Sequence, residues 1–423
     1  MYTNINIMIK KFLFLFATLC SGVVMAQQGT SSPYSFYGIG DVRFKGTIEN
    51  RAMGSITAHG DSIHVNLQNP AYHSAIRLTT FAVGATYGTN QIESNTQSAK
   101  ARTTALDYIA VVIPTKRVGF SLGLMPFSSV GYNVLNDLNS SIIRQYTGTG
   151  GINKVYFATS FRVTPNFSIG ADVNYNFGNI ETKSISAFPG VEFATREINT
   201  SNATGVNYNF GLRYQKLFKK KYLVYTSAVF SPEANLNFNN TRQLALISWI
   251  IGGSESVIPG QTQDLEVADT KIKLPSKFDF GLGFGQTNKW TIGANVLFQN
   301  ASNFGNRNND ITNVRFENAT RFSLGGYYIP NYKSFSSYFD RIVYRAGLRY
   351  ENTGLILNDK SITDTAATLG LGLPVRGTFS NVNFVFEYGS RGTQSNNLVR
   401  ERYFNIGFAF SFNDQWFQRR KYD

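Results

Sequence analysis

The chain has 423 residues, of which only 16% are charged and 14% aromatic, and Asn, Ser, Thr and Gly supply most of its polarity. After residue 26 it has no apolar run of about eighteen residues, which argues against a membrane-spanning helix in the mature chain. Near-neutral hydropathy does not exclude a transmembrane β-barrel, because the strands of such a barrel alternate apolar and polar residues.

The first 26 residues have the pattern of a secretory signal peptide. Lys10 and Lys11 precede the apolar stretch FLFLFATLCSGVV, and the small residue Ala26 lies at the expected cleavage point. The apolar stretch is thirteen residues long, too short for a transmembrane anchor. A lipoprotein site at Cys20 is disfavoured because Leu19 occupies a position that needs a small residue.

The mature chain would contain no cysteine and would be basic. Removing two lysines leaves 38 basic against 26 acidic residues, a net charge of +12. The basic residues are scattered and cluster mainly in turns such as KLFKKK (216–221) and in the C-terminal RRK. This distribution favours solvated turns and contact with anionic lipid, and we predict no nucleic-acid partner.

From residue 78 onward, segments of alternating residues recur between turns and loops. Fourteen strands are predicted at 78–88, 104–114, 118–130, 154–163, 166–178, 203–215, 221–231, 272–286, 289–299, 319–329, 341–351, 365–373, 380–389 and 400–412. Their lengths suit a tilted strand that crosses a bilayer, which needs about nine to eleven residues. The predicted connections alternate between short ones, such as 115–117, and long ones, such as 179–202 and 232–271. This asymmetry is typical of an outer-membrane barrel, so the expected fold is all-β: an antiparallel transmembrane barrel over 78–412.

The stretch FSIGADVNYNFG (167–178) illustrates the two faces of these strands. Its apolar set includes Ile169, Val173 and Tyr175, and its polar set includes Asp172 and Asn174. In a membrane barrel the apolar set faces lipid and the polar set faces the lumen. The residues predicted to line a polar lumen are Asp172, Asn174, Asn176, Arg213, Arg345, Arg349 and Glu387. They are interpreted either as a charged ladder that holds a ligand carboxylate or, with more weight, as structural ion pairs.

Several motifs resemble the FadL family of outer-membrane transport proteins, as a Bacteroidetes-type member. The segment KLPSKFDFGLGFGQTNKWTIGANVLFQNASNF (273–304) is similar to a Leu-Pro entry followed by two Gly-rich strands. NLQNPAYHSAI (66–76) resembles the Asn-Pro-Ala motif between the plug and the first strand of this family. SLGLMPFSSVGY (121–132) resembles its third strand, and RIVYRAGLRYENT (341–353) resembles a late strand.

The resemblance implies a fourteen-stranded barrel that is closed by an N-terminal hatch and passes hydrophobic compounds sideways through a gap in its wall. Asn69, Pro70 and Ala71 match the hatch motif, and Pro126, Phe127 and Ser128 match the lateral opening. Ser128 departs from the glycine of the family. The tail at 413–423 is basic and aromatic, as in relatives that serve a protein-secretion translocon.

Residues 27–77 alternate little and are predicted to form the plug; the alternative is a periplasmic arm. A proline inside a strand removes a ladder hydrogen bond, so Pro126 either opens the wall or only ends a strand. His59, His64 and His73 all fall in the plug segment, without the spacing of a metal site, and ordinary polar packing is favoured. No cofactor and no metal are predicted. The rest of the chain has no histidine for hydrolytic chemistry, so no catalytic residues and no enzyme are predicted.

The segment RQLALISWIIGG (242–253), within the longest predicted loop, is too apolar to remain in water. The residues concerned are Leu244, Leu246, Ile247, Trp249 and Ile250. They could capture an apolar ligand, dock a partner protein or pack against the barrel rim.

Three functions follow from these features. The first is passive transport of hydrophobic small molecules, such as fatty acids or aromatic compounds, by a porin-like barrel in the outer membrane of a Gram-negative-type bacterium, in contact with outer-membrane lipids. The second is a non-transporting accessory or plug subunit of a secretion translocon, with a translocon protein as its partner. The third is a periplasmic binding protein.

Overall fold

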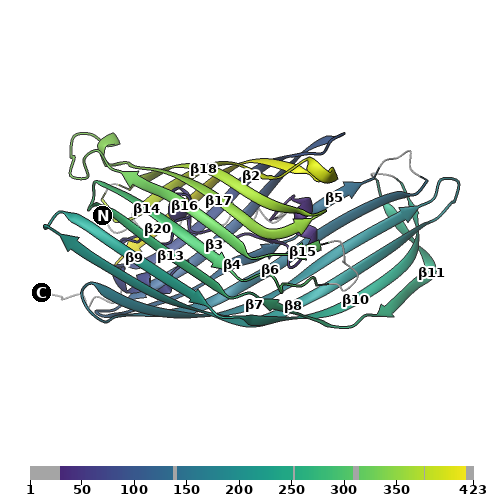
Figure 1. Ribbon diagram of the computed structural model, residues 1–423, viewed down its shortest axis with the longest axis horizontal. Coiled ribbons are helices and arrows are strands. Elements are labelled where there is room, and N and C mark those ends of the chain that lie inside the picture. Colours follow the sequence, from purple (N-terminus) through teal and green to yellow (C-terminus); the bar gives the residue numbers. More distant parts are fainter. Residues whose placement is uncertain (1–28, 137–140, 251–252, 308–313, 376, 416–423) are drawn as a thin grey trace, which may run out of the picture.

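A ring of antiparallel strands surrounds the lumen in the computed structural model, which describes residues 29–136, 141–250, 253–307, 314–375 and 377–415 (Figure 1). The ring has fourteen positions, and some of them are occupied by two or three successive strands. In chain order the positions are occupied by β2 (Thr79–Glu93); β3 (Ser98–Pro114); β4 (Val118–Ser129) with β5 (Tyr132–Leu135); β6 (Ile143–Arg162); β7 (Phe167–Ala187); β8 (Ala194–Phe218); β9 (Tyr222–Ser231) with β10 (Ala234–Trp249); β11 (Glu255–Glu266) with β12 (Thr270–Leu274) and β13 (Lys277–Gln286); β14 (Trp290–Gln299); β15 (Val314–Phe316) with β16 (Ala319–Tyr328); β17 (Val343–Leu357); β18 (Lys360–Pro374); β19 (Asn381–Gly392); and β20 (Arg400–Asp414).

The ring closes between its last and first strands. β20 pairs with β2 in an unbroken register from Thr79↔Asp414 to Glu93↔Arg400. Closure satisfies the backbone groups of what would otherwise be two open sheet edges. The predicted barrel of fourteen strands is thereby confirmed.

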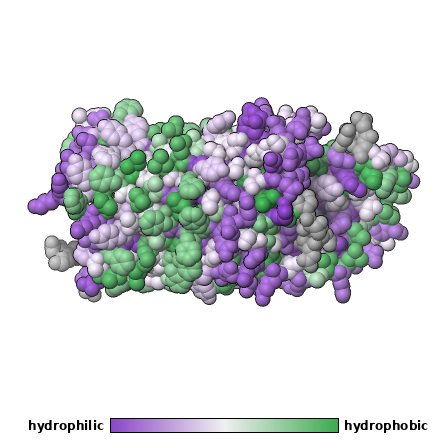
Figure 2. Space-filling view, in the orientation of Figure 1, coloured by the Kyte–Doolittle hydropathy of each residue, from purple (hydrophilic) through white to green (hydrophobic). Residues whose placement is uncertain are grey.

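The alternation of the sequence becomes the two faces of the wall. Tyr175 is 50% exposed, whereas the next residue, Asn176, is fully buried. Phe210 and Leu212, on the neighbouring strand, are also exposed, while Arg213 is nearly buried. Apolar side chains gather over one half of the molecule, on the left in Figure 2, and hydrophilic side chains dominate the middle. An apolar belt of this kind is what a barrel presents to lipid.

The two longest loops predicted from the sequence are mostly strand, so those predictions are wrong. Most of residues 179–202 belong to β7, which ends at Ala187, and to β8, which begins at Ala194. Residues 232–271 contain β10, β11 and the first two residues of β12; β10 and β11 extend the sheet at the right of Figure 1. The Asn- and Thr-rich sequence of these extensions suggested loops, but continuous ladders to neighbouring strands hold them as strands.

The apolar segment predicted as a loop therefore lies on β10 up to Trp249, with Ile250 just beyond it. Ile247 is fully buried in a small core with Ile185, Ala194 and Ala245, and Trp249 packs against that core. Glu255 of β11 binds Lys183 of β7 at 3.0 Å. These strands are separated in the sheet by β8 and β10, so the extension must curl to bring them together. Leu246 and Ile250 remain exposed, and Leu244 is partly buried.

Residues 29–77, which we call the inner segment, run along the inside of the barrel. They contain η1 (Pro33–Phe36), β1 (Asp41–Val42), α2 (Ile48–Arg51) and η2 (Pro70–Ala75); the barrel itself carries η3 (Phe339–Arg341) and η4 (Ser395–Asn397). α2 contacts β18, β19 and β20, and η2 contacts five strands from β3 to β8. Among the described residues, no helix is both long and apolar enough to cross a membrane. The predicted signal peptide and residues 416–423 of the predicted tail lie outside the described residues.

Candidate functional site

The Asn-Pro-Ala motif fixes the end of the inner segment to the wall. The Asn69 side chain caps η2 by accepting a hydrogen bond from the Ala71 amide at 2.9 Å. Its own amide donates to the carbonyl of Leu212 on β8 at 3.0 Å. Pro70 follows the cap as the first helical residue, where its missing N–H costs nothing. One side chain therefore orders the turn and binds it to the wall.

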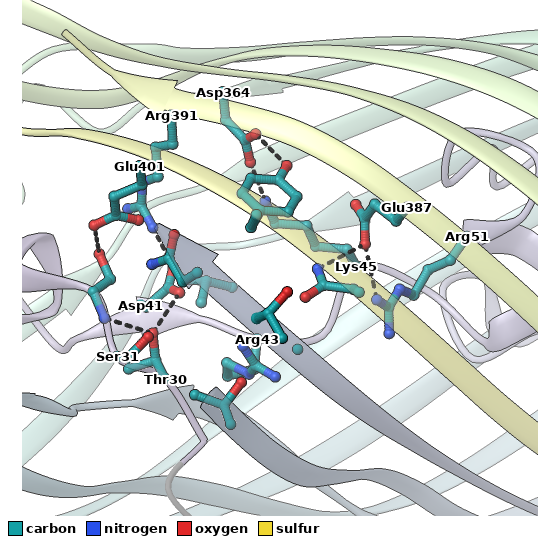
Figure 3. A pocket seen from close by; sticks show the side chains of 18 of the residues that line it. Thr30, Ser31, Asp41, Arg43, Lys45, Arg51, Asp364, Glu387, Arg391 and Glu401 are labelled. Carbon is teal, nitrogen blue, oxygen red and sulfur yellow. Dashed lines mark hydrogen bonds and ion pairs between the residues drawn. The ribbon is translucent and has the colours of Figure 1, made fainter. Parts of the chain in front are cut away.

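A buried ion network fixes the middle of the inner segment. Arg51, at the end of α2, donates to Asp107 of β3 at 3.1 Å and to Glu387 of β19 at 2.9 Å. Asp107 sits at a bulge, because the β2–β3 register skips it between Tyr108 and Leu106. Arg349 of β17 binds the other oxygen of Glu387 at 2.7 Å. Figure 3 shows Arg51 and Glu387 facing one another across the boundary between segment and wall.

Further ion pairs continue this network along the inner segment. Lys45 binds Asp364 of β18 at 2.6 Å and Glu351 of β17 at 3.4 Å. Asp41 of β1 accepts from Arg391 of β19 at 2.8 Å (Figure 3). The segment thus makes ion pairs at residues 41, 45 and 51, all to carboxylates or guanidinium groups on the wall. These pairs are partly buried, and breaking one is costly where the charge that remains is shielded from water, as at Asp364.

In the described structure, the first part of β3, residues 98–108, does not pair with β4. The β3–β4 ladder ends at Ile109↔Leu124, although both strands continue beyond that pair. The end of β4 pairs instead with β1, through Asp41↔Ser129 and Val42↔Ser128. The register between β4 and β6 shifts between Pro126 and Ser128, which places a bulge there. A cavity of about 510 Å³ lies at this seam, between Ala105 and Leu106 of β3 and Pro126 and Ser128 of β4.

Phe127 at the same bulge lines a second cavity, of about 180 Å³, inside the barrel. The ammonium groups of Lys154 on β6 and Lys277 on β13 lie 5.7 and 5.9 Å from the centre of its ring. Among the residues that the structure describes, neither lysine has a carboxylate within ion-pair distance. Tyr37 and Phe304 line the same cavity. The pocket therefore combines aromatic surface with two cations that have no ion-pair partner in the described part of the chain.

The residues predicted to line the lumen all lie on the inner face, but in separate groups. Asp172 accepts hydrogen bonds from Asn174 and Asn209 at 2.5 and 2.7 Å, while Asn176 donates to Asn207 at 2.7 Å. The guanidinium of Arg213 lies 5.1 Å from the ring centre of Tyr72 on the inner segment.

The remaining two lumen arginines also have protein partners. Arg345 donates to Asn383 at 2.8 Å. Asn383 in turn donates to Glu49 of the inner segment. Arg349 and Glu387 belong to the buried network. No single ladder is formed; each group supports the wall or the inner segment.

The three histidines occupy three different surroundings. His64 binds Asp61 at 2.6 Å. His59 lies between the rings of Tyr225 and Tyr327. His73 is buried, and neither of its ring nitrogens has a hydrogen-bond partner among the residues that the structure describes. The described residues contain no group of three His, Cys, Asp or Glu side chains that could hold a metal ion.

We expect the inner segment to dock less tightly at pH 5 than at pH 7. Burial lowers the pKa of His59 and of His73 to about 4. Below about pH 6.5 the unfolded chain therefore binds more protons than the folded chain, and the stability of the docked segment decreases as the pH is lowered. Burial also opposes the charge of His64, but Asp61 outweighs it and raises its pKa. The stabilisation that His64 gives the folded state is therefore fully present below about pH 6.5 and is lost only at higher pH.

Hydrogen exchange of residues 59–73, corrected for intrinsic rates, should accelerate at least tenfold between pH 7 and pH 5, which corresponds to about 1.4 kcal/mol of lost protection. His73→Gln should reduce this acceleration, because glutamine does not titrate. Equal protection at both pH values in the unmodified protein would contradict the prediction.

The sequence interpretation missed Lys45, Arg51, Lys154 and Lys277. Lys154 could have been found, because it alternates in phase with the inward residues Tyr156 and Ala158. Lys45 and Arg51 carry no such signal, since the inner segment has no regular period.

Comparison with known proteins adds the family. A family model described as BamG matches residues 8–423. The chain belongs to the BamG family. A search of curated proteins finds no match.

The fold of this BamG-family chain is similar to those of solved hydrocarbon channels. The toluene transporter TbuX of Ralstonia pickettii has a TM-score of 0.59 and 14% identity, over 87% of this chain and 98% of TbuX. The toluene transporter TodX of Pseudomonas putida has a TM-score of 0.57 and 16% identity, over 88% and 98%. A FadL homologue of Pseudomonas aeruginosa has a TM-score of 0.57 and 12% identity, over 89% and 98%. At such identities the likeness establishes a FadL-type barrel fold.

Proposed function

We propose that this protein is an outer-membrane barrel of a Gram-negative-type bacterium that admits hydrophobic small molecules through its wall. The observation that carries the proposal is the seam between β3 and β4, where the ladder stops at Ile109↔Leu124 and a cavity of about 510 Å³ takes its place. In this proposal Pro126, Phe127 and Ser128 form the lateral opening and Asn69, Pro70 and Ala71 hold the hatch. The domains are the plug at 27–77, the barrel at 78–412 and the tail at 413–423.

The inner cavity beside the seam supports a substrate class within this proposal. Phe127 belongs to the bulge at the seam and also lines the inner cavity with Lys154 and Lys277. A cation lacking a carboxylate partner in a partly apolar site favours an anionic ligand group. A fatty-acid-like molecule, with one carboxylate and an apolar chain, has that chemistry.

We expect Ala105→Trp to reduce uptake of a long-chain fatty acid at least fivefold, because the indole would fill the seam cavity that the buried Ala105 lines. Pro126→Val should act in the same direction if the bulge keeps the wall open. The assay is uptake of a fluorescent fatty acid by cells that express each variant, with heat-modifiable gel mobility as the test of barrel assembly.

The matched control is Ala171→Trp, at a position paired with the exposed Phe210 on the outer face of β7. It should leave uptake unchanged. If Ala105→Trp assembles and transports normally, the seam is not the route.

A second candidate function is an accessory barrel of a secretion translocon. The curled extension of β7, β8, β10 and β11 favours it, because it projects beyond the other strands at one end of the barrel and exposes Leu246 and Ile250 (Figure 1). Purification in mild detergent separates the two candidates: a stable large partner supports the accessory role, whereas a bound lipid without a partner supports transport.

A further inference from the structure

Four basic side chains gather on the outer face of three neighbouring strands. Arg400 and Arg402 lie on β20, and Lys100 and Arg102 lie on β3. β2 runs between these strands, with Gln91 paired to Arg402 on one side and to Lys100 on the other. Two strand spacings amount to about 10 Å, so long basic side chains on β3 and β20 can reach one ligand group. We call these four residues the basic patch.

The basic patch is only partly neutralised. Glu93 of β2 binds Arg400 at 2.8 Å and Arg402 at 3.3 Å. Lys100 and Arg102 are exposed, and in the described ranges no carboxylate lies within ion-pair distance of either. Four cations with one acid leave an excess of positive charge at a single place on the outer wall.

An apolar groove begins beside the basic patch. Ser390 pairs with Arg402, and Thr365 pairs with Ser390. Both residues line a groove of about 720 Å³ that crosses β14 and β16 to β19. Its walls include Phe322, Leu348, Tyr350 and Tyr388, all exposed, and the small residue Ala367 lies among them. The groove and the patch are therefore one continuous surface, cationic at one end and apolar along the other.

From this continuity we propose that the surface binds a phosphate-bearing lipid with the chemistry of lipid A. Guanidinium and ammonium groups bind phosphate through charge-assisted hydrogen bonds, and the groove accepts an acyl chain. Phe404 lies between the patch and the apolar belt on β20, as an interfacial aromatic residue would. Charge complementarity selects an anionic lipid over a neutral one. The inference rests on the proposed membrane location but not on transport.

The test uses the full chain purified in detergent and diphosphoryl lipid A as the probe, detected by native mass spectrometry. The triple variant Lys100→Gln, Arg102→Gln, Arg402→Gln should bind the probe at least tenfold more weakly than the unmodified protein. Arg400 keeps its bond to Glu93 in this variant. The matched control, Lys216→Gln, Lys219→Gln, Lys220→Gln, removes the same charge from exposed positions in the β8–β9 region and should bind like the unmodified protein.

Further arms distinguish the lipid from free phosphate and from general charge. Dephosphorylated lipid A should bind weakly, and inorganic pyrophosphate should not displace the lipid at equal concentration. Ala367→Trp, which fills the groove, should also weaken lipid binding.

Binding that survives the triple variant, falls equally in the control, or is matched by pyrophosphate would overturn the site. Heat-modifiable gel mobility tests separately whether the barrel assembles. If the triple variant does not assemble, the single variant Lys100→Gln, at an exposed position, replaces it and should also bind the probe more weakly than the unmodified protein. Loss of the barrel signal in the unmodified protein would count against the proposed function instead.

Discussion

Arg51→Leu is expected to release the inner segment from the wall while the barrel remains assembled. The substitution leaves Asp107 buried with only the Thr86 hydroxyl as a described side-chain partner, and removes one of the two arginines from Glu387. Breaking one partner of a buried ion pair costs about 3–5 kcal/mol, because the remaining charge is left in a poorly solvating site. That cost falls on the docked state alone, since water reaches these carboxylates when the segment leaves.

Protease sensitivity of residues 46–58 in the purified protein measures the release, and heat-modifiable mobility measures the barrel. Arg43→Leu is the control, because Arg43 lies in the same segment and the described residues offer its side chain no ion pair. The double variant Arg51→Leu, Asp107→Leu should recover part of the loss, since replacing both partners by apolar groups leaves no unpaired charge. Full protection in Arg51→Leu would show that the network does not hold the segment.

The fold could be predicted because its information is local. The period of two residues in each strand predicts which side chains share a face. The exposed Tyr175 and the buried Asn176 beside it match this prediction. The ends of the strands were harder to predict from the sequence. Residues 179–187 and 194–202 are rich in Ser, Thr and Asn, and only their ladder, such as Glu181↔Thr200, makes them strand.

The contacts of the inner segment could not be predicted in the same way. Arg51 meets residues 56 and 336 positions away in the chain, and no local pattern links them. The position of Asp107 depends on a bulge, which shifts the register of β3 by one residue. Sequence reasoning placed Glu387 and Arg349 on the lumen face, but which plug residue they meet follows from the path of an irregular segment.

Two glycines of the inner wall allow the backbone of the inner segment to lie against β16 and β17. A Cβ atom at Gly347 of β17 would overlap the backbone of Met53 and Gly54, and one at Gly325 of β16 would overlap the carbonyl of Met53. Gly54 has a φ of +70°, a conformation that favours glycine, so the turn at this contact depends on a second residue without a side chain. Backbone therefore lies directly on backbone, and these wall positions have no room for a side chain.

Gly347→Val should displace residues 48–58 and open the lumen. Valine suits a β-strand, and Gly347 does not have a positive φ, so β17 itself should tolerate the change. The strain falls on the inner segment, whose backbone must move out of contact. Conductance of single barrels in a planar bilayer should rise about tenfold, as expected if about 1.4 kcal/mol shifts a closed state toward an open one.

Gly305→Val is the matched control, since a Cβ there meets nothing within 4 Å and should leave conductance unchanged. Hydrogen exchange of residues 48–58 reports displacement independently of current. If Gly347→Val neither raises conductance nor exposes those residues, the segment is not held against β17 as the geometry requires. If exchange rises but conductance does not, the lumen is closed by more than this contact, and the ion pairs of Lys45 and Asp41 become the next groups to remove.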